Sequence, residues 1–279
     1  MQSLLALFYA IEGLLYPLLF CAALGFLVKG RQLFSDLRRA LPQTSLNLQI
    51  MGFNIVFVVP FIVIASTALG NFVDRHGLVL TSPSFWAVLP HLAVICLGVV
   101  IGDFTGYWRH RLEHTALLWP AHAVHHSDTE MTFLTLERFH PINRVTTFLI
   151  DSSVLIFIGF PPYAVIANSL VRSNYGYFIH ADLPWTYGPL NKIFVSPAMH
   201  RWHHALDRAA FNTNYATVFG LWDWMFGTHR VPGPCTAPLG VTDDMAATLK
   251  GQMLYALSPR AYRRLFRKSA ADSAVKPNE

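Results

Sequence analysis

The chain has 279 residues, of which 53% are hydrophobic and only 13% are charged, and its mean hydropathy is +0.37. Soluble domains carry about a quarter charged residues, so this composition excludes an ordinary soluble domain and predicts an integral membrane protein. The net charge of +5 accompanies no nucleic-acid-binding motif. We therefore interpret the charge as a signal of membrane orientation and anionic lipids, and we expect no nucleic-acid partner.

Three long apolar stretches precede most of the histidines, over residues 4–28, 46–69 and about 85–107. Each is long enough for the roughly 20 residues that cross a bilayer as a helix. The first stretch has no basic n-region and no small-residue cleavage site, which predicts a retained span and not a signal peptide. We expect residues 1–84 to form an N-terminal transmembrane region and residues 269–279 to form a disordered tail.

The apolar stretch 145–178 is interrupted by Pro161 and Pro162. Each arm is too short to cross a bilayer easily, and prolines end a helix, so we expect a helical hairpin that enters the membrane and returns. The histidines on its two sides, at 110–126 and 180–204, then lie on the same side of the membrane. The predicted fold is an all-α integral membrane protein with about three full spans and one Pro-Pro-interrupted hairpin.

Basic residues predict the orientation of these spans. The loop after the first span and the C-terminal region are rich in them, whereas the loop after the second span has only Arg75, beside Asp74. By the positive-inside rule, the histidines and the C-terminus face the cytoplasm. No endoplasmic-reticulum retention signal occurs, which favours a bacterial inner membrane. The basic residues are Lys29, Arg31, Arg38 and Arg39 in the first loop, and Arg260, Arg263, Arg264, Arg267 and Lys268 near the C-terminus.

Nine of the thirteen histidines form three clusters and one outlier. Within the clusters the spacings of three and four direct the imidazoles to one side of a helix, and Ser196 with Pro197 predicts the start of the last of these helices. One zinc takes about four ligands, so nine imidazoles favour two metals. Imidazole suits zinc, copper, iron and nickel, and no cysteine lies near the clusters to make a thiolate or iron–sulfur site. The candidate ligands are His110, His114, His122, His125, His126, His180, His200, His203 and His204.

Two further residues are candidates for the catalytic site, Asp103 and His140. Asp103 precedes His110 by two helical turns, and a carboxylate inside a span is a functional candidate, either as a ligand or as the partner of one. The alternative is a carboxylate paired with a basic group at the membrane edge. His140 either orients a ligand or marks a turn before Pro141. The histidines without cluster partners are interpreted as structural: His76, His91 and His229.

Three other interpretations of these motifs are open. His110 to His114 also matches HxxEH, the inverted zinc-protease motif, although a mononuclear protease would leave the other clusters without a purpose. A membrane metal transporter would use the histidines as transit sites, but such sites usually lie near the bilayer midplane. The aromatic residues Trp222, Trp224 and Phe226 lie either at the lipid headgroups or in the core.

The motifs together resemble the fatty acid hydroxylase and sterol desaturase superfamily of membrane di-iron enzymes. That resemblance rests on a DxxxYWxHRxxH segment at 103–114, an HxxHH segment at 122–126, RxHP at 138–141, a second HxxHH at 200–204, NxNY at 212–215 and WDxxFGT at 222–228. Some fatty acid hydroxylases carry a histidine at the position of Pro184, so the chain looks closer to the sterol desaturase and alkylglycerol monooxygenase side.

The resemblance implies that residues 85–268 form a catalytic domain whose nine clustered histidines hold two ferrous ions. It further implies that O2 is a cosubstrate and that a membrane lipid is hydroxylated or desaturated. No cytochrome b5 signature and no Rossmann or flavin fingerprint occurs in the chain. We therefore expect a separate electron donor, which is cytochrome b5-like, ferredoxin-like or a reduced pterin.

Overall fold

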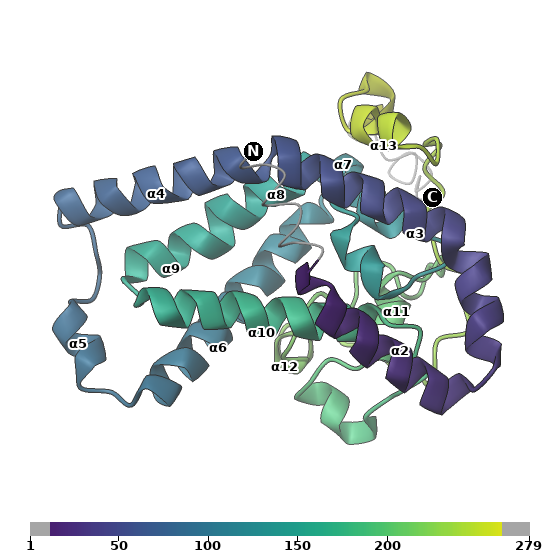
Figure 1. Cartoon of the computed structure of the whole chain (residues 1–279), viewed down its shortest axis with the longest axis horizontal. Coiled ribbons are helices and arrows are strands. Elements are labelled where there is room, and N and C mark those ends of the chain that lie inside the picture. Colours follow the sequence, from purple (N-terminus) through teal and green to yellow (C-terminus); the bar gives the residue numbers. More distant parts are fainter. Residues whose placement is uncertain (1–11, 264–279) are drawn as a thin grey trace, which may run out of the picture.

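The computed structural model describes residues 12–263, which fold into helices (Figure 1). Within that range the extended pairing is one isolated bridge between Ala205 and Leu239. Two helices are long and apolar enough to cross a membrane, or three when a bent pair counts as one span. The prediction of an all-α membrane protein is confirmed. Residues 4–11 of the first predicted span and the predicted tail lie outside the described residues.

The N-terminal helices differ in detail from the predicted spans. Helix α2 (Leu15–Lys29) is apolar but only 15 residues long. Helices α3 (Gln32–Phe57) and α4 (Val59–Arg75) meet at an angle of 46°. The predicted span 46–69 is thus a bent pair, because Pro60 lies in the first turn of α4 and has no N–H to donate to the turn before it.

The third predicted span corresponds to α6 (His91–Glu113), which follows the short helix α5 (Pro83–Ala87). Helix α6 starts after Pro90 and continues six residues beyond the expected end. This extension carries His110 out of the apolar part of the span without a break in the helix.

The predicted hairpin is present, and its turn lies at the two prolines. One arm is a continuous run formed by α8 (Pro141–Thr147), the π-helical turn η2 (Phe148–Ser152) and α9 (Ser153–Ile158). Gly159 ends this arm with φ +84°, and α10 (Pro162–His180) returns. The expectation that both arms are too short was wrong for the first one. It begins at Pro141, before the apolar stretch, and is a candidate span of 18 residues.

Helices α6 and α10 pack closely because glycine recurs every fourth residue on one face of α6. A Cβ at Gly98 would be in ordinary contact with Ala164, at 3.5 Å from its carbonyl oxygen. A Cβ at Gly102 would overlap Asn168, and one at Gly106 would overlap the Arg172 guanidinium. Small residues at this spacing are a common means of close helix approach in membranes. Here they make room for polar side chains of α10.

The histidines lie at the end of the molecule where α6 and α10 finish. Between these helices and the C-terminal segments lie α7 (Trp119–His126), η1 (Phe133–Glu137) and α11 (Pro197–His203). Ser196 caps α11 by accepting a hydrogen bond from Met199 N, as predicted. The remaining elements are η3 (Gly188–Lys192), α12 (Leu221–Met225), α13 (Leu249–Tyr255) and η4 (Pro259–Tyr262).

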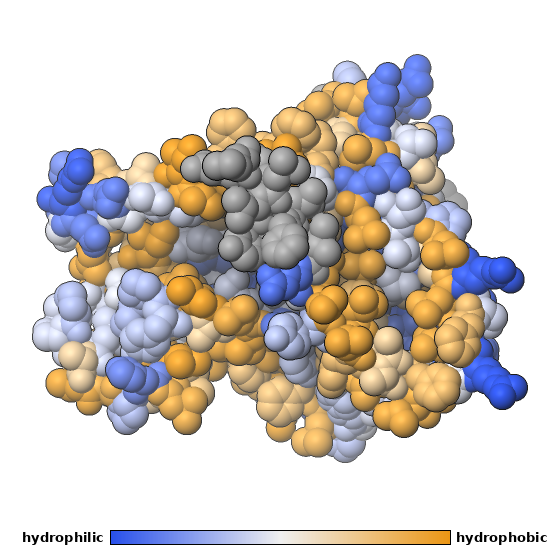
Figure 2. Space-filling model, viewed as in Figure 1, coloured by the Kyte–Doolittle hydropathy of each residue, from blue (hydrophilic) through white to orange (hydrophobic). Residues whose placement is uncertain are grey.

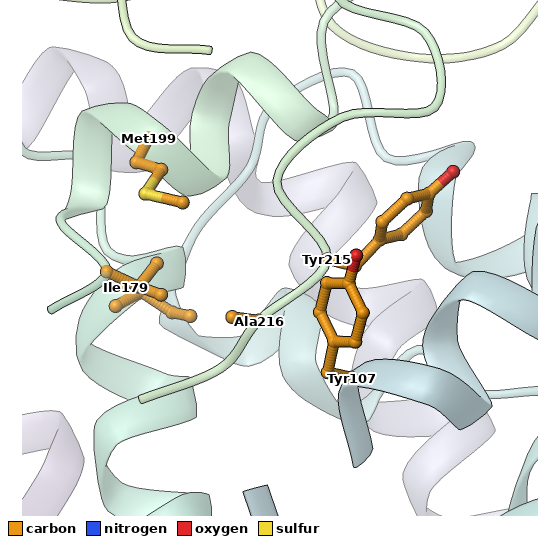
Figure 3. Close-up of a cluster of buried hydrophobic side chains, with 6 residues drawn as sticks. Tyr107, Ile179, Met199, Tyr215 and Ala216 are labelled. Atoms are coloured by element: carbon orange, nitrogen blue, oxygen red, sulfur yellow. The ribbon is translucent and has the colours of Figure 1, made fainter. Parts of the chain in front are cut away.

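A small apolar cluster joins these segments to the spans. Figure 3 shows Tyr107 of α6 and Tyr215 of the loop before α12 near Ile179, Met199 and Ala216. On the surface, Figure 2 shows hydrophobic residues over much of the visible face, with strongly hydrophilic residues gathered largely at its left and right margins. This distribution suits helices that run between two aqueous boundaries.

Candidate metal centre

The nine predicted histidine ligands come together in two adjacent groups. In each group one possible ligand atom per residue lies within 4.8 Å of every other. All nine side chains are buried except that of His114, which is half-buried. The first histidine group is His110, His114, His122, His126 and His203, and the second histidine group is His125, His180, His200 and His204.

Helical spacing explains why one sequence cluster serves both groups. On α7, His122 and His126 are four residues apart and share a face, whereas His125 points to the second group. On α11 and its C-cap the division is reversed, because His200 and His204 share the second group and His203 joins the first. Each of these helices therefore lies between the two groups.

Backbone carbonyls determine which ring nitrogen faces the centre of each group. The Nδ1–H of His110 donates to Tyr215 O at 2.7 Å, and that of His203 donates to Thr213 O at 2.6 Å. In the second group, His180 Nδ1–H donates to Gly176 O at 2.7 Å. Because a neutral imidazole carries one proton, these bonds leave each Nε2 as an unprotonated electron-pair donor.

In each group the Nε2 atoms of three histidines lie close together. His110 Nε2 lies 2.9 Å from the Nε2 atoms of both His122 and His203. His180 Nε2 lies 3.0 Å from His200 Nε2 and 3.2 Å from His125 Nε2. Two ligands at right angles on one ion, each with a metal–nitrogen bond of about 2.1 Å, are about 3 Å apart. The arrangement therefore fits a cation in each group.

Further ring nitrogens support the same conclusion. Among the described residues, buried imidazole nitrogens without a hydrogen-bond partner occur in both groups. An unpaired buried polar atom is costly, and a bound cation would satisfy His114 Nε2, His126 Nε2 and one nitrogen of His204. The unpaired Nδ1 atoms of His125 and His200 lie across the ring from the Nε2 atoms that face the second group.

Burial also keeps the imidazoles in the form that binds metal. Desolvation, followed by the mutual repulsion of neighbouring histidines, lowers the pKa of His126 and His204 well below the ordinary value. Desolvation lowers the pKa of His203 to about 4. Neutral imidazole is the ligating form, so the site can bind metal at neutral pH without first losing protons from these rings.

The two predicted catalytic residues lie outside both histidine groups. Asp103 is fully buried, and its carboxylate accepts hydrogen bonds from Val218 N, Phe219 N and Trp222 Nε1 at 2.9–3.1 Å. His140 caps α8 by accepting from Ile142 N, and its Nε2–H donates to Met253 O at 3.0 Å. A catalytic role for either residue stays a prediction. In this structure both side chains form hydrogen bonds with backbone groups that lie close to them in space.

The motifs that follow the last histidine cluster hold the loop that supplies the carbonyls. Asp223 accepts hydrogen bonds from Tyr215 N, Ala216 N and the Thr228 hydroxyl at 2.6–2.9 Å. Asn214 has a left-handed backbone, with φ 58°, and its amide donates to Met199 O and Arg230 O. The loop that orients His110 and His203 is thus fixed by two buried polar side chains.

A series of buried ion pairs behind the first histidine group was not predicted from the sequence. Arg109 donates to Glu113 at 2.7 Å and to Asp151 at 3.0 Å, and Arg172 donates to Asp151 at 3.0 Å. The Glu113 carboxylate lies 3.3 Å from His122 Nδ1. The sequence feature that could have indicated these ion pairs is the presence of charged residues within apolar stretches. The π-helical turn η2, which carries Asp151, was not predictable from periodicity.

We predict that Glu113 strengthens metal binding by orienting His122. Its carboxylate also accepts the Thr146 hydroxyl at 2.5 Å, so it is rigidly held. The variant Glu113→Gln is expected to weaken binding at the first histidine group by about 10- to 100-fold, since partners of ligating histidines have effects of this size. Cobalt titration of the metal-free protein would show one of two binding steps weakened.

Glu137→Gln is the matched control for that experiment. Glu137 is a carboxylate that accepts hydrogen bonds from Arg144 and Tyr177, and no hydrogen bond or ion pair joins it to a clustered histidine in the described residues. Both binding steps should be unchanged in this variant. Equal behaviour of the two glutamine variants would contradict a positioning role for Glu113.

A cavity of about 350 Å³ opens beside both histidine groups. His110 and His122 line it from the first group, and His125, His180 and His200 line it from the second. Its other walls come largely from the hairpin arms and from the segment just before them. They include Phe139, Leu155, Val165 and Ile179 together with charged and hydroxyl side chains. A second cavity of about 150 Å³ reaches His114, His126 and His203 of the first group, between residues 205–212 and 240–243.

The fold and the site together define a helical membrane protein with a buried, histidine-rich metal site. Comparison with known proteins gives the family: residues 95–228 match the fatty acid hydroxylase family, and the chain belongs to it, as its motifs predicted. No solved structure matches the chain.

Curated relatives carry names from lipid metabolism. The chain is 32% identical over 188 residues to the ornithine lipid hydroxylase OlsE of Rhizobium tropici, which covers 67% of this chain and 56% of the relative. It is 34% identical over 133 residues to human alkylglycerol monooxygenase, covering 47% of this chain and 29% of the relative. It is 28% identical over 166 residues to the very-long-chain aldehyde decarbonylase GL1-11 of Oryza sativa, covering 51% of this chain and 56% of the relative. The chain thus spans about half of these relatives' length, or less.

Proposed function

We propose that the chain is a membrane-bound di-iron oxygenase that hydroxylates a lipid C–H bond, using O2 and electrons from a separate donor. The observation that carries this proposal is the pair of adjacent histidine groups, in which buried Nε2 atoms face one another at 2.9–3.2 Å. Two ions held side by side can act on one substrate. When bound, the irons would supply the activation of O2 that no side chain can provide.

The protein's own residues hold, orient and shield the reacting groups. The carbonyls of Tyr215, Thr213 and Gly176 keep three imidazoles in the ligating tautomer. The larger cavity receives the lipid beside both groups. Apolar wall residues such as Leu155, Val165 and Ile179 would limit the access of water, which protects a reactive centre from side reactions.

Relatives favour hydroxylation over desaturation. Two of them are named as a lipid hydroxylase and a monooxygenase. The third is named as a decarbonylase of very-long-chain aldehydes. A desaturase would use the same ligands and remains the alternative reaction. We also propose that the histidine groups face the cytoplasm in a bacterial inner membrane, that residues 85–268 form the catalytic domain, and that the electron donor is cytochrome b5-like, ferredoxin-like or a reduced pterin.

The test is metal content together with the origin of the product's oxygen. Purified protein should contain about two irons per chain and should consume O2 only with both reductant and a lipid extract. Under ¹⁸O2, hydroxylation would place the heavy isotope in a lipid product, whereas desaturation would remove two hydrogens and add no oxygen. One zinc or no metal, without O2 consumption, would overturn the oxygenase and favour the protease or transporter interpretation.

A further inference from the structure

An exposed apolar surface extends from α6 onto segments that are not candidate spans. Trp224 and Met225 of α12 are 53% and 55% exposed, and Leu190 of η3 is 56% exposed. Large apolar patches on a protein surface mark interaction sites. We call this surface the aromatic patch; its members are Phe104, Trp108, Leu190, Ile193, Phe194, Trp224, Met225 and Phe226.

The aromatic patch is continuous with a candidate membrane span. Phe104 and Trp108 belong to α6, and Phe226 follows α12. The ring of Phe226 lies 4.9 Å from that of Trp108 and 6.3 Å from that of Phe104. Helix α12 also packs on η3, where Gly220 leaves room for the carbonyl of Asn191. Figure 1 shows α12 in the lower middle of the molecule, away from α13 at the top.

Two cations lie over the tryptophans of the patch. Lys192 Nζ is 5.8 Å from the centre of the Trp224 ring, and the Arg111 guanidinium is 5.3 Å from that of Trp108. Tryptophan with a neighbouring basic residue is characteristic of the lipid headgroup region, because the ring suits the boundary and the cation reaches the phosphates. Helix α12 and η3 have five residues each, too few to span.

We propose that the aromatic patch lies in the headgroup region of the bilayer and that Lys192 and Arg111 bind anionic phospholipid headgroups there. Phe104 and Trp108 occupy the second half of α6, close to the end of a candidate span, so the boundary of the bilayer falls at this level of the helix. A surface that continues a span at that level meets lipid. Opposite charge then favours phosphatidylglycerol-like lipids over neutral ones.

A short series of hydrogen bonds connects the aromatic patch with the first histidine group. Asp223 lies in α12 next to Trp224, and its carboxylate holds the N–H groups of Tyr215 and Ala216. Tyr215 O in turn accepts the Nδ1–H of His110. The proposal does not depend on iron or O2, so it can fail while the oxygenase stands, and the reverse.

The first experiment measures the depth of Trp224 in vesicles. The protein is reconstituted in phosphatidylcholine vesicles that contain lipids brominated close to the headgroup, and tryptophan fluorescence is compared with that of Trp224→Phe. We expect Trp224 to contribute strongly to the quenching. Trp202→Phe is the matched control, because Trp202 is half-buried outside the patch and donates to Gly233 O. Quenching of Trp224 by aqueous iodide, or protection from both quenchers by a second copy or a protein partner, would overturn the proposal.

The second experiment tests the choice of lipid. Spin-labelled phosphatidylglycerol should associate with the protein more strongly than spin-labelled phosphatidylcholine. Lys192→Gln should reduce that preference about five-fold, as expected for one cation at the surface of an anionic membrane. Lys250→Gln, an exposed lysine on α13, is the control. An unchanged preference in Lys192→Gln would refute the headgroup contact.

Discussion

Replacing His126 and His203 with alanine is expected to leave about one metal ion per chain, whereas replacing His204 as well should leave nearly none. The double variant loses two imidazoles of the first histidine group, which leaves three there and all four in the second group. The triple variant leaves only three in the second group as well. Each ion depends on about four ligands. Elemental analysis of the purified variants would measure the difference.

His229→Ala is the control for these variants, because His229 belongs to neither group among the described residues. It should keep the full metal content. If the double and triple variants retained the same number of ions, the division of the nine histidines into two groups would be wrong.

Gly106→Ala is expected to lower the free energy of unfolding by about 2–4 kcal/mol, because it overpacks the helix contact and displaces a buried charge. The new Cβ would overlap the Arg172 guanidinium, which is paired with Asp151. That ion pair is connected through Arg109 and Glu113 to His122. Metal binding at the first histidine group should therefore weaken as well. Thermal unfolding in detergent and cobalt titration would measure the two effects.

Gly98→Ala, on the same face of the same helix, is the matched control. Its Cβ would lie at ordinary contact distance from Ala164, at 3.5 Å from the carbonyl oxygen. Alanine also favours the helix over glycine by about 1 kcal/mol, so this variant should be neutral or slightly more stable. Similar losses in both variants would show that α6 requires flexibility at its glycines, and not room for Arg172.

The buried ion pairs connect three helical segments beside the first histidine group. Arg109 and Arg172 share Asp151, which lies on the π-helical turn η2 of the first hairpin arm. Turns of this kind often occur at functional sites. The two hairpin arms and α6 are thereby joined by ion pairs. The candidate ligand His122 contacts these ion pairs through Glu113, at 3.3 Å.

Much of the site was determined by the sequence alone. The helical spacing of His122 and His126, and of His200 and His204, is a local property that periodicity reveals. The apolar stretches and the Pro161–Pro162 break predicted a membrane protein with a hairpin, because bilayer thickness and proline chemistry act on short segments. The motifs added the family and the nine candidate ligands, although bending at Pro60 changed one predicted span.

Only the tertiary structure decided how these residues are divided and supported. His125 and His126 are neighbours in the chain but belong to different groups, because they point to different sides of α7, which lies between the two groups. Asp103 shares a helix face with His110, yet its carboxylate holds the backbone of Val218 and Phe219, more than a hundred residues away. Hydrogen bonds and ion pairs act over a few ångströms in space, so contacts between distant segments leave no periodic signal in the sequence.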